Sequence, residues 1–186
     1  MMDIIETPLK DLYILKPKVF TDNRGYFFES YSQVKMPNAY QSVTFIQDNQ
    51  SLSMQKGTLR GIHFQNHPKA QTKLVRCIQG SIWDVAVDLR VGSPTYLKWY
   101  GVELTSTNYH QLLVPKGFGH GFMTLKDNTI VAYKVDEYYA KDQDRSIRFD
   151  DPNFNIDWKG LKPILSEKDM KAPLLKESDV NFKYTL

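Results

Sequence analysis

The chain has 186 residues, and this length predicts a single domain, because domains typically run to about 100–200 residues. Hydrophobic residues make up 41% and charged residues 24%, with a mean hydropathy of −0.46, which is typical of a globular protein without membrane spans. The 24 basic and 21 acidic residues nearly cancel and lack the concentrated basic stripe of general nucleic-acid binders. We therefore expect neither membrane nor nucleic acid as a partner.

The N-terminal residues and the cysteine content indicate the compartment. Residues 1–15 mix acidic with apolar side chains and lack the basic and apolar regions of a secretory signal, so none is predicted. Cys77 is the single cysteine, which excludes an intrachain disulfide and a multi-cysteine zinc site. It lies in an apolar run and is expected to be a small buried hydrophobe. We predict a reduced, cytoplasmic protein.

Short runs of β-branched and aromatic residues, broken by Gly, Pro, Asn and Asp, predict an all-β fold. In chain order, strands are expected at 13–20, 44–50, 73–79, 81–89, 96–105, 111–114 and 129–138. Residues 33–38 predict a turn or two of helix, and Ser166 predicts a helix N-terminus. We expect one domain over 1–186, a sandwich or barrel with residues 150–186 as a C-terminal arm packed on it.

Residues 81–89 give the clearest strand pattern. Alternation assigns Trp83, Val85, Val87 and Leu89 to one face and Ile82, Asp84, Ala86 and Asp88 to the other. Gly80-Ser81 predicts a tight hairpin to the preceding strand, 73–79. In the later strand, Val131, Tyr133 and Val135 are expected to share a face.

Two of the four histidines lie in glycine-rich segments. His63 lies in GTLRGIHFQ (57–65), and His120 lies in PKGFGHGF (115–122), which matches the P-x-G-x-x-H pattern of cupin barrels. A metal site normally needs about three protein ligands, but Gln65 stands where a second histidine would be expected, and no glutamate follows before Glu103. We therefore expect no metal, and assign acid–base chemistry to the imidazoles.

An ordered set of motifs covers nearly the whole chain. It comprises DNRGYFFE (22–29), QDNQS (47–51), LRGIHFQ (59–65), QTKLVR (71–76), DVAVDLR (84–90), PKGFGHGF (115–122), AYK (132–134), DDP (150–152), IDW (156–158) and LSEKD (165–169). Taken together, the set resembles the dTDP-4-dehydrorhamnose 3,5-epimerase family.

The resemblance implies a cupin-type antiparallel β-barrel (jelly roll), a homodimer, and no metal or organic cofactor. It implies an isomerase acting on a nucleoside-diphosphate 4-keto-6-deoxy sugar. The expected reaction inverts C3 and C5 of dTDP-4-dehydro-6-deoxy-D-glucose to give dTDP-4-dehydro-L-rhamnose. In the family, the stretch around 24–29 can reach into the partner subunit's site.

The expected chemistry needs a base, a proton donor and positive charge at an enolate oxygen, because the C4 ketone acidifies the hydrogens on C3 and C5. The resemblance implies His63 as base, Asp169 as its partner, Tyr133 as proton donor and Lys73 beside the enolate oxygen. From the pattern alone, Tyr133 would be a core aromatic and Lys73 a surface lysine. Asp169 would belong to a Ser166-x-x-Asp169 helix cap, a role that can coexist with pairing.

The remaining expected residues bind substrate. Arg60 is the candidate for the diphosphate, because guanidinium binds phosphate bidentately, with Arg24 and Lys168 as further cations. His120 is assigned to the sugar or enolate, and Glu29, Gln47 and Asn49 to hydroxyl and amide groups. Tyr138 is expected to stack on the nucleobase, with Tyr139 as the neighbouring alternative. Asp144 stands where many family members have glutamate near the nucleotide, so the base identity stays open.

Four alternatives remain at this point. The same chemistry could act at C3 alone, or on another nucleotide or sugar such as a GDP-linked 4-keto heptose. A non-catalytic sugar-binding cupin would be expected to lose the base or the donor. A metal-dependent cupin dioxygenase would show stoichiometric iron on metal analysis.

Overall fold

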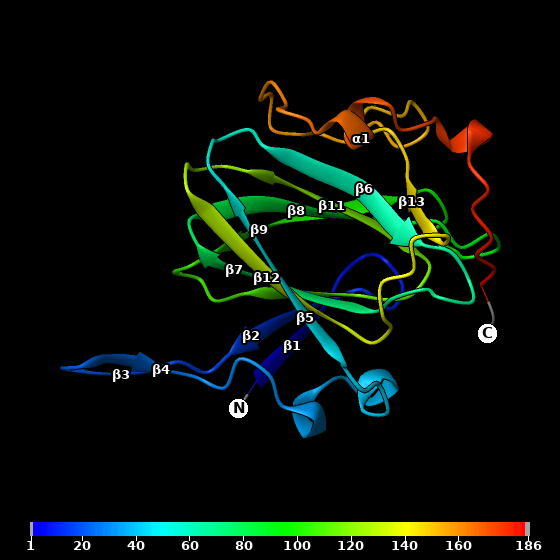
Figure 1. Cartoon of the computed structure of the whole chain (residues 1–186). Helices are drawn as coiled ribbons and strands as arrows, with labels where there is room; N and C mark the ends of the chain where they lie inside the picture. The colour runs from blue at the N-terminus through cyan, green and yellow to red at the C-terminus, as the bar shows by residue number, and fades with distance from the viewer. Residues whose placement is uncertain (1, 185–186) are drawn as a thin grey trace.

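The computed structural model describes residues 2–184, in which two large antiparallel sheets face each other (Figure 1). The six-stranded sheet has the order β1 (Met2–Glu6), β2 (Tyr13–Pro17), β10 (Gln111–Val114), β7 (Lys73–Gln79), β12 (Thr129–Val135), β5 (Gln47–Ser53). The five-stranded sheet has the order β13 (Asp144–Ser146), β6 (Leu59–Gln65), β11 (Phe118–Thr124), β8 (Ser81–Asp88), β9 (Trp99–Thr105). The predicted antiparallel β-barrel is confirmed.

Three apolar cores hold the sheets and their covering segments together. The central core lies between the sheets and includes Ile14, Val75, Ile82, Leu112 and Phe118. A second core, with Val85 and Val87, lies on the outer face of the five-stranded sheet beneath the C-terminal arm. A third covers the six-stranded sheet with two 3₁₀ turns, Gln33–Lys35 and Asn38–Tyr40.

The two faces of strand β8 lie in two different apolar cores, in agreement with the alternating pattern of residues 81–89. Ile82 and Ala86 face the central core, whereas Val85, Val87 and Leu89 face the core under the arm, as predicted. Both faces are buried because helical and irregular segments cover the outside of the sheet. Asp84 is fully buried on the inward face, between the apolar side chains of Ile82 and Ala86.

The C-terminal arm is joined to the barrel by backbone hydrogen bonds. Leu59 N donates to Ile164 O at 2.9 Å, and Ile164 N donates to Gly57 O at 2.8 Å. The arm carries α1 (Glu167–Met170) and a 3₁₀ turn, Leu175–Glu177, and in Figure 1 it lies over β6. This pairing places the start of α1 beside the strand that carries His63.

The predicted hairpin at Gly80-Ser81 is wrong. Strand β7 pairs with β10 and β12, and β8 pairs with β9 and β11, so the chain passes at Gly80 from one sheet to the other. Gly80 has a φ of +84°, and a Cβ there would lie 2.4 Å from Thr129 Oγ1. Close packing on Thr129 and a left-handed backbone therefore turn the chain across the barrel.

Most other expected strands are confirmed, with shifted ends. The first ends at Pro17 because proline has no N–H to continue a ladder, and Phe20–Asp22 (β3) begins a separate hairpin with Gly25–Phe27 (β4). Strand β9 begins only at Trp99, since Leu97 has a φ of 62°. Strand β12 ends at Val135, and the next side chain, Asp136, accepts a hydrogen bond from Thr72 N.

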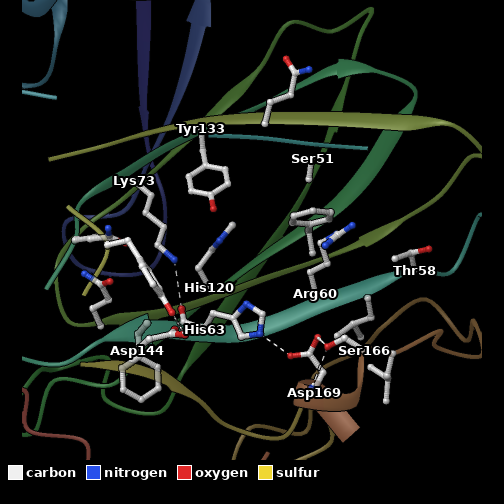
Figure 2. Close-up of a pocket in the computed structure, with 18 of the residues that line it drawn as sticks. Ser51, Thr58, Arg60, His63, Lys73, His120, Tyr133, Asp144, Ser166 and Asp169 are labelled. Carbon is white, nitrogen blue, oxygen red and sulfur yellow. Dashed lines mark hydrogen bonds and ion pairs between the residues drawn. The ribbon is translucent and has the colours of Figure 1, made fainter. Parts of the chain in front are cut away.

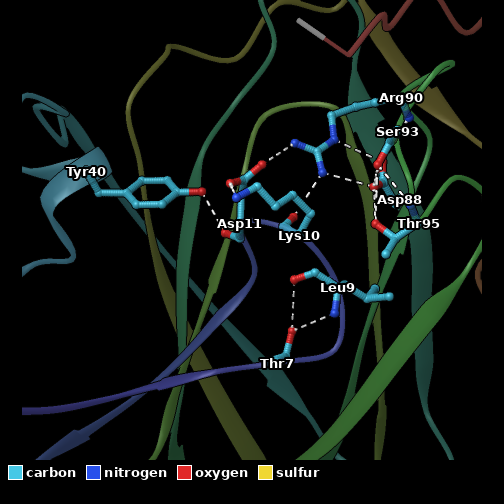
Figure 3. Close-up of polar contacts among 9 residues, drawn as sticks. All are labelled: Thr7, Leu9, Lys10, Asp11, Tyr40, Asp88, Arg90, Ser93 and Thr95. Carbon is cyan, nitrogen blue, oxygen red and sulfur yellow. Dashed lines mark hydrogen bonds and ion pairs between the residues drawn. The ribbon is translucent and has the colours of Figure 1, made fainter. Parts of the chain in front are cut away.

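A buried polar network fastens the N-terminal turn to the end of β8 (Figure 3). The Arg90 guanidinium donates to both carboxylate oxygens of Asp88 at 2.9 Å, to Asp11 at 2.8 Å and to Lys10 O at 2.9 Å. Tyr40 O–H donates to Asp11 O at 2.7 Å. The network thus links three segments that are distant in sequence.

The β3–β4 hairpin projects from the body of the chain (Figure 1). Its aromatic side chains are exposed, with Phe20 at 52%, Tyr26 at 58% and Phe27 at 66%.

Cys77 is free and buried, as predicted. Within residues 2–184, no helix has the length and apolar character needed to cross a membrane.

Candidate active site

A cavity of about 410 Å³ opens between the two sheets and the arm (Figure 2). This volume lies within the usual range for small-molecule sites. The sequence-predicted residues that line it are Arg60, His63, Lys73, His120, Tyr133, Asp144 and Asp169. They come from both sheets and from α1, so the barrel and the arm assemble the site together.

A β-bulge in β6 brings Arg60 and His63 to one face. Residues three apart in a regular strand point to opposite faces. Here β6 pairs His63 with His120 and Arg60 with Phe122, so three steps on β6 match two on β11. Gly61 lies within the bulge with a φ of +136°, where a Cβ would come within 2.4 Å of Gly121 Cα. The close strand approach requires glycine and turns both side chains into the cavity.

His63 and Asp169 form a pair at the mouth of the cavity. His63 Nε2 lies 2.5 Å from Asp169 Oδ1, and Asp169 is 3% exposed. The Ser166 side chain donates to Asp169 Oδ2 at 2.8 Å and accepts from Asp169 N at 3.1 Å. Burial opposes the charge on Asp169, but hydrogen bonds from His63 and Ser166 outweigh it and hold the pKa of Asp169 below its ordinary value. The expected cap and the expected pairing therefore coexist.

Tyr133 and Lys73 enter the cavity from the six-stranded sheet, opposite His63 (Figure 2). Burial raises the pKa of Tyr133, so the phenol keeps its proton at neutral pH. Lys73 is 8% exposed, which excludes a solvated surface lysine, and its Nζ donates to His63 O at 3.4 Å. Burial lowers the pKa of Lys73 to about 8, against the opposing charges of Asp144 and Asp84.

His120 and a carboxylate lie deeper in the barrel. His120 is 7% exposed and is the cross-strand partner of His63, so the two rings face the same cavity. Its Nε2 lies 2.8 Å from Asp84 Oδ1. The sequence pattern placed Asp84 on the same strand face as Ile82 and Ala86, but no role was predicted for it.

Asp144, Lys168 and Tyr139 form a cluster at the other edge of the cavity. Lys168 Nζ donates to Asp144 Oδ2 at 2.6 Å, and Tyr139 O–H donates to the same oxygen at 3.3 Å. Both Tyr138 and Tyr139 are largely exposed, at 61% and 59%, but only Tyr139 is among the residues that line the cavity. Adjacent residues of an extended chain point in opposite directions, so the two tyrosine side chains diverge here and only Tyr139 reaches the cavity wall.

The other expected binding residues lie outside this cavity. Gln47 and Asn49 are half-buried on β5, and Gln47 Nε2 donates to Asn49 Oδ1 at 2.8 Å. Arg24 is at the β3–β4 turn and binds Asp22 at 2.6 Å, and Glu29 is exposed and bound to Lys35. A single chain therefore does not bring Arg24 and Glu29 to the cavity.

The sequence model of the dTDP-4-dehydrorhamnose 3,5-epimerase family matches residues 6–177. The chain belongs to this family. The epimerases of this family are isomerases, and the resemblance read from the sequence motifs is confirmed.

Individual epimerases are similar over nearly their whole length. The Sinorhizobium fredii dTDP-4-dehydrorhamnose 3,5-epimerase is 48% identical over 177 residues, 95% of this chain and 91% of that protein. The Bacillus anthracis epimerase structure with TDP and PPi bound gives a TM-score of 0.91 at 50% identity, covering 94% of this chain and 100% of the other. The Legionella pneumophila epimerase complex with dTDP-4-keto-L-rhamnose gives 0.95 at 42% identity, with 100% of each chain covered. These similarities confirm the cupin-type jelly roll.

Three further residues of this epimerase site had no predicted role. Ser51 lines the cavity and its Oγ is buried without a hydrogen-bond partner among the described residues. Thr58 lies at the arm side of the cavity, and Gln65 binds the backbone of Tyr138 and Ala140. Ser51 could have been found because Gln47, Asn49 and Ser51 follow one another at intervals of two residues. Within residues 2–184, no three His, Cys, Asp or Glu side chains group to hold a metal ion.

Proposed function

We propose that this chain inverts C3 and C5 of dTDP-4-dehydro-6-deoxy-D-glucose, yielding dTDP-4-dehydro-L-rhamnose. The observation that carries the proposal is the His63–Asp169 pair, which faces the Tyr133 phenol across one cavity. The activity belongs to residues 1–186 as one domain, because the barrel supplies the base and the arm supplies its carboxylate. We place the reaction in the cytoplasm, where the free Cys77 stays reduced.

The two epimerisations use the same pair of groups. In a D-gluco ring, the hydrogens on C3 and C5 are axial on one face, so a single base reaches both. His63 takes the proton, and Asp169 orients the ring and balances its charge. Tyr133 returns a proton to the opposite face of the carbon, which inverts it. The phenol can donate because its raised pKa keeps it protonated.

The enolate intermediate needs positive charge at the C4 oxygen. We assign the Lys73 ammonium to this oxygen, because it is buried beside His63 and its charge acts in a low-dielectric site. The acidity of C3 and C5 comes from the ketone of the substrate. The proposed chemistry therefore requires no metal or organic cofactor.

The lowered pKa of Lys73 predicts how kcat/KM changes at alkaline pH. A pKa of about 8 means that the ammonium is lost as pH rises through about 8, so kcat/KM should fall there. Lys73→Arg keeps its charge to much higher pH, so it should move the fall upward while lowering the maximum rate. Steady-state kinetics from about pH 6 to about pH 10 measure this. A wild-type profile that stays flat through this range would remove the ammonium from the mechanism.

The nucleoside diphosphate occupies the remaining polar surface. Arg60 is assigned to the diphosphate, with Lys168 as a second cation at the cavity edge. We assign nucleobase stacking to Tyr139 in place of Tyr138, because Tyr139 lies on the wall. Gln47 and Asn49 supply amide groups on the same face of β5 as Ser51.

We propose a homodimer in which the β3–β4 hairpin of one protomer completes the partner's site. The hairpin exposes aromatic side chains and carries Arg24 away from its own cavity. In the partner's cavity, Arg24 would bind the diphosphate and Glu29 a hydroxyl group. Burial of Phe20, Tyr26 and Phe27 would offset their exposure in the single chain.

Mixing two inactive variants tests the shared site. Arg24→Ala and His63→Ala should each be nearly inactive as homodimers. After subunit exchange at equal concentrations, half of the dimers are mixed and one of their two sites is intact, so about a quarter of the wild-type activity should return. No recovery, with mixed dimers verified by native mass spectrometry, would show that each site is built within one chain.

Hydrogen exchange tests the function itself. The protein is incubated in D₂O with dTDP-4-dehydro-6-deoxy-D-glucose, and the C3 and C5 protons are followed by NMR. Deuterium at both carbons with inverted product is the expected result. Exchange at C3 alone would restrict the function to a 3-epimerase. No exchange with this substrate, followed by exchange with a GDP- or UDP-linked keto sugar, would contradict the nucleotide assignment.

A further inference from the structure

The cavity contains a second histidine–carboxylate pair, deeper than the first. The His120 and Asp84 side chains are 8% and 0% exposed, compared with 31% for His63. Because His120 and His63 are cross-strand partners, their rings lie on the same face of the five-stranded sheet (Figure 2). Each imidazole is bound through Nε2 to a carboxylate.

Packing alone does not account for Asp84. Its neighbours on the inward face of β8, Ile82 and Ala86, belong to the central apolar core. Its Oδ2 is buried and has no hydrogen-bond partner among residues 2–184. A buried carboxylate with unmet hydrogen-bonding capacity disfavours folding, and an apolar residue would be better tolerated here. The position therefore indicates a role in the site.

The contact determines which nitrogen of His120 carries a proton. An ionised carboxylate only accepts hydrogen bonds, so the 2.8 Å contact requires a proton on Nε2. The buried Lys73 ammonium interacts electrostatically with Asp84. In the neutral ring, Nδ1 then has a lone pair. The contact to Asp84 is the only side-chain hydrogen bond of His120 among the described residues, so Nδ1 stays available to a ligand.

We propose that Asp84 is a positioning residue that fixes the Nε2–H tautomer of His120, so that Nδ1 accepts a hydrogen bond from a ring hydroxyl of the sugar. The hydrogen bond from the sugar to Nδ1 rests on the proposed function, whereas the tautomer of His120 does not. The ketone oxygen at C4 needs a donor, which Lys73 supplies, and the neighbouring hydroxyl needs an acceptor, which His120 supplies. Together they orient the C3 hydrogen toward His63.

NMR of the ligand-free protein tests the tautomer without substrate. In protein with ¹⁵N-labelled histidine, His120→Gln identifies the His120 signals by their loss. We expect Nε2 to be protonated and Nδ1 unprotonated at neutral pH, and Asp84→Asn to mix the tautomers, because an amide can donate as well as accept. A proton on Nδ1 in the wild type, whether from a protonated Asp84 or a cationic ring, would overturn the proposal. If Asp84→Asn does not fold, the wild-type spectrum alone tests which nitrogen of His120 carries the proton.

Kinetics then tests whether Asp84 acts through His120. Asp84→Asn and His120→Gln should each lower kcat/KM by about 10- to 100-fold, as expected for one buried hydrogen bond to substrate. The double variant should be no worse than His120→Gln. Asp150→Asn, an exposed carboxylate of the arm, is the matched control and should keep full activity. If Asp84→Asn lowers kcat/KM in the His120→Gln background by the same factor as in the wild type, the proposal is contradicted. The proposal is also contradicted if Asp84→Asn mixes the tautomers of His120 but keeps full activity.

Discussion

Replacing His63 by alanine is expected to lower kcat by about 10²–10⁴-fold, the usual contribution of a positioned general base. His63 lies 2.5 Å from Asp169 and opposite Tyr133, and no other imidazole in the described chain has this pairing with the arm. Asp169→Asn should also reduce kcat, because the amide no longer orients or balances the ring. Affinity for dTDP should change little in either variant, since Arg60 and Tyr139 remain.

Single-turnover exchange in D₂O and dTDP titration calorimetry separate these effects. His110→Gln is the matched control, because His110 lies outside the cavity in the segment before β10, and it should exchange at the wild-type rate. A His63→Ala variant with wild-type exchange would transfer the role of base to another residue. Loss of dTDP binding together with turnover would instead indicate that the cavity has collapsed.

Replacing Arg90 by leucine is expected to lower the free energy of unfolding by about 3–5 kcal/mol, the cost of leaving a buried charge without its partner. Asp88 is fully buried, and Arg90 meets both of its oxygens while also holding Asp11 and Lys10 O. The guanidinium also packs over the rings of Phe118 and Tyr184, at 4.7 Å and 4.9 Å. The substitution removes all of these contacts together.

Urea unfolding followed by circular dichroism measures this effect. Arg148→Leu is the control, because its partner Asp150 is exposed and such surface pairs contribute about 0–1 kcal/mol. The double variant Asp88→Leu/Arg90→Leu should be more stable than Arg90→Leu alone, since no buried charge remains unpaired. If Arg90→Leu and Arg148→Leu have equal effects, the network in Figure 3 does not stabilise the fold.

Local pattern predicted strands where side chains alternate strongly, and it failed where backbone geometry decides. Residues 73–79 and 111–114 have the predicted bounds, because their apolar faces are regular. Strands β6 and β11 were not predicted, although they carry His63 and His120, because glycines interrupt their alternation. The sheet change at Gly80 depends on packing against Thr129, which lies far along the chain.

The residues of the candidate site were also predictable only in part from the sequence. The motifs identified Arg60, His63, Lys73, Tyr133 and Asp169, but spacing alone would place Arg60 and His63 on opposite faces. Only the bulge at Gly61 brings them together. The choice between Tyr138 and Tyr139 depends on the direction of one irregular segment, and a role for Asp84 appeared only when its partner His120 was located.

The attachment of Asp169 to the arm has a consequence for biosynthesis. All strands of the barrel have been synthesised once the chain reaches residue 146, but the carboxylate that pairs with His63 follows only at residue 169. At about 5–20 residues per second, a ribosome needs about 1–5 s to add the intervening stretch. During that interval the nascent barrel has its imidazole without the matching acid. Under the proposed mechanism, catalytic competence is therefore acquired late in translation, after the strands have been made.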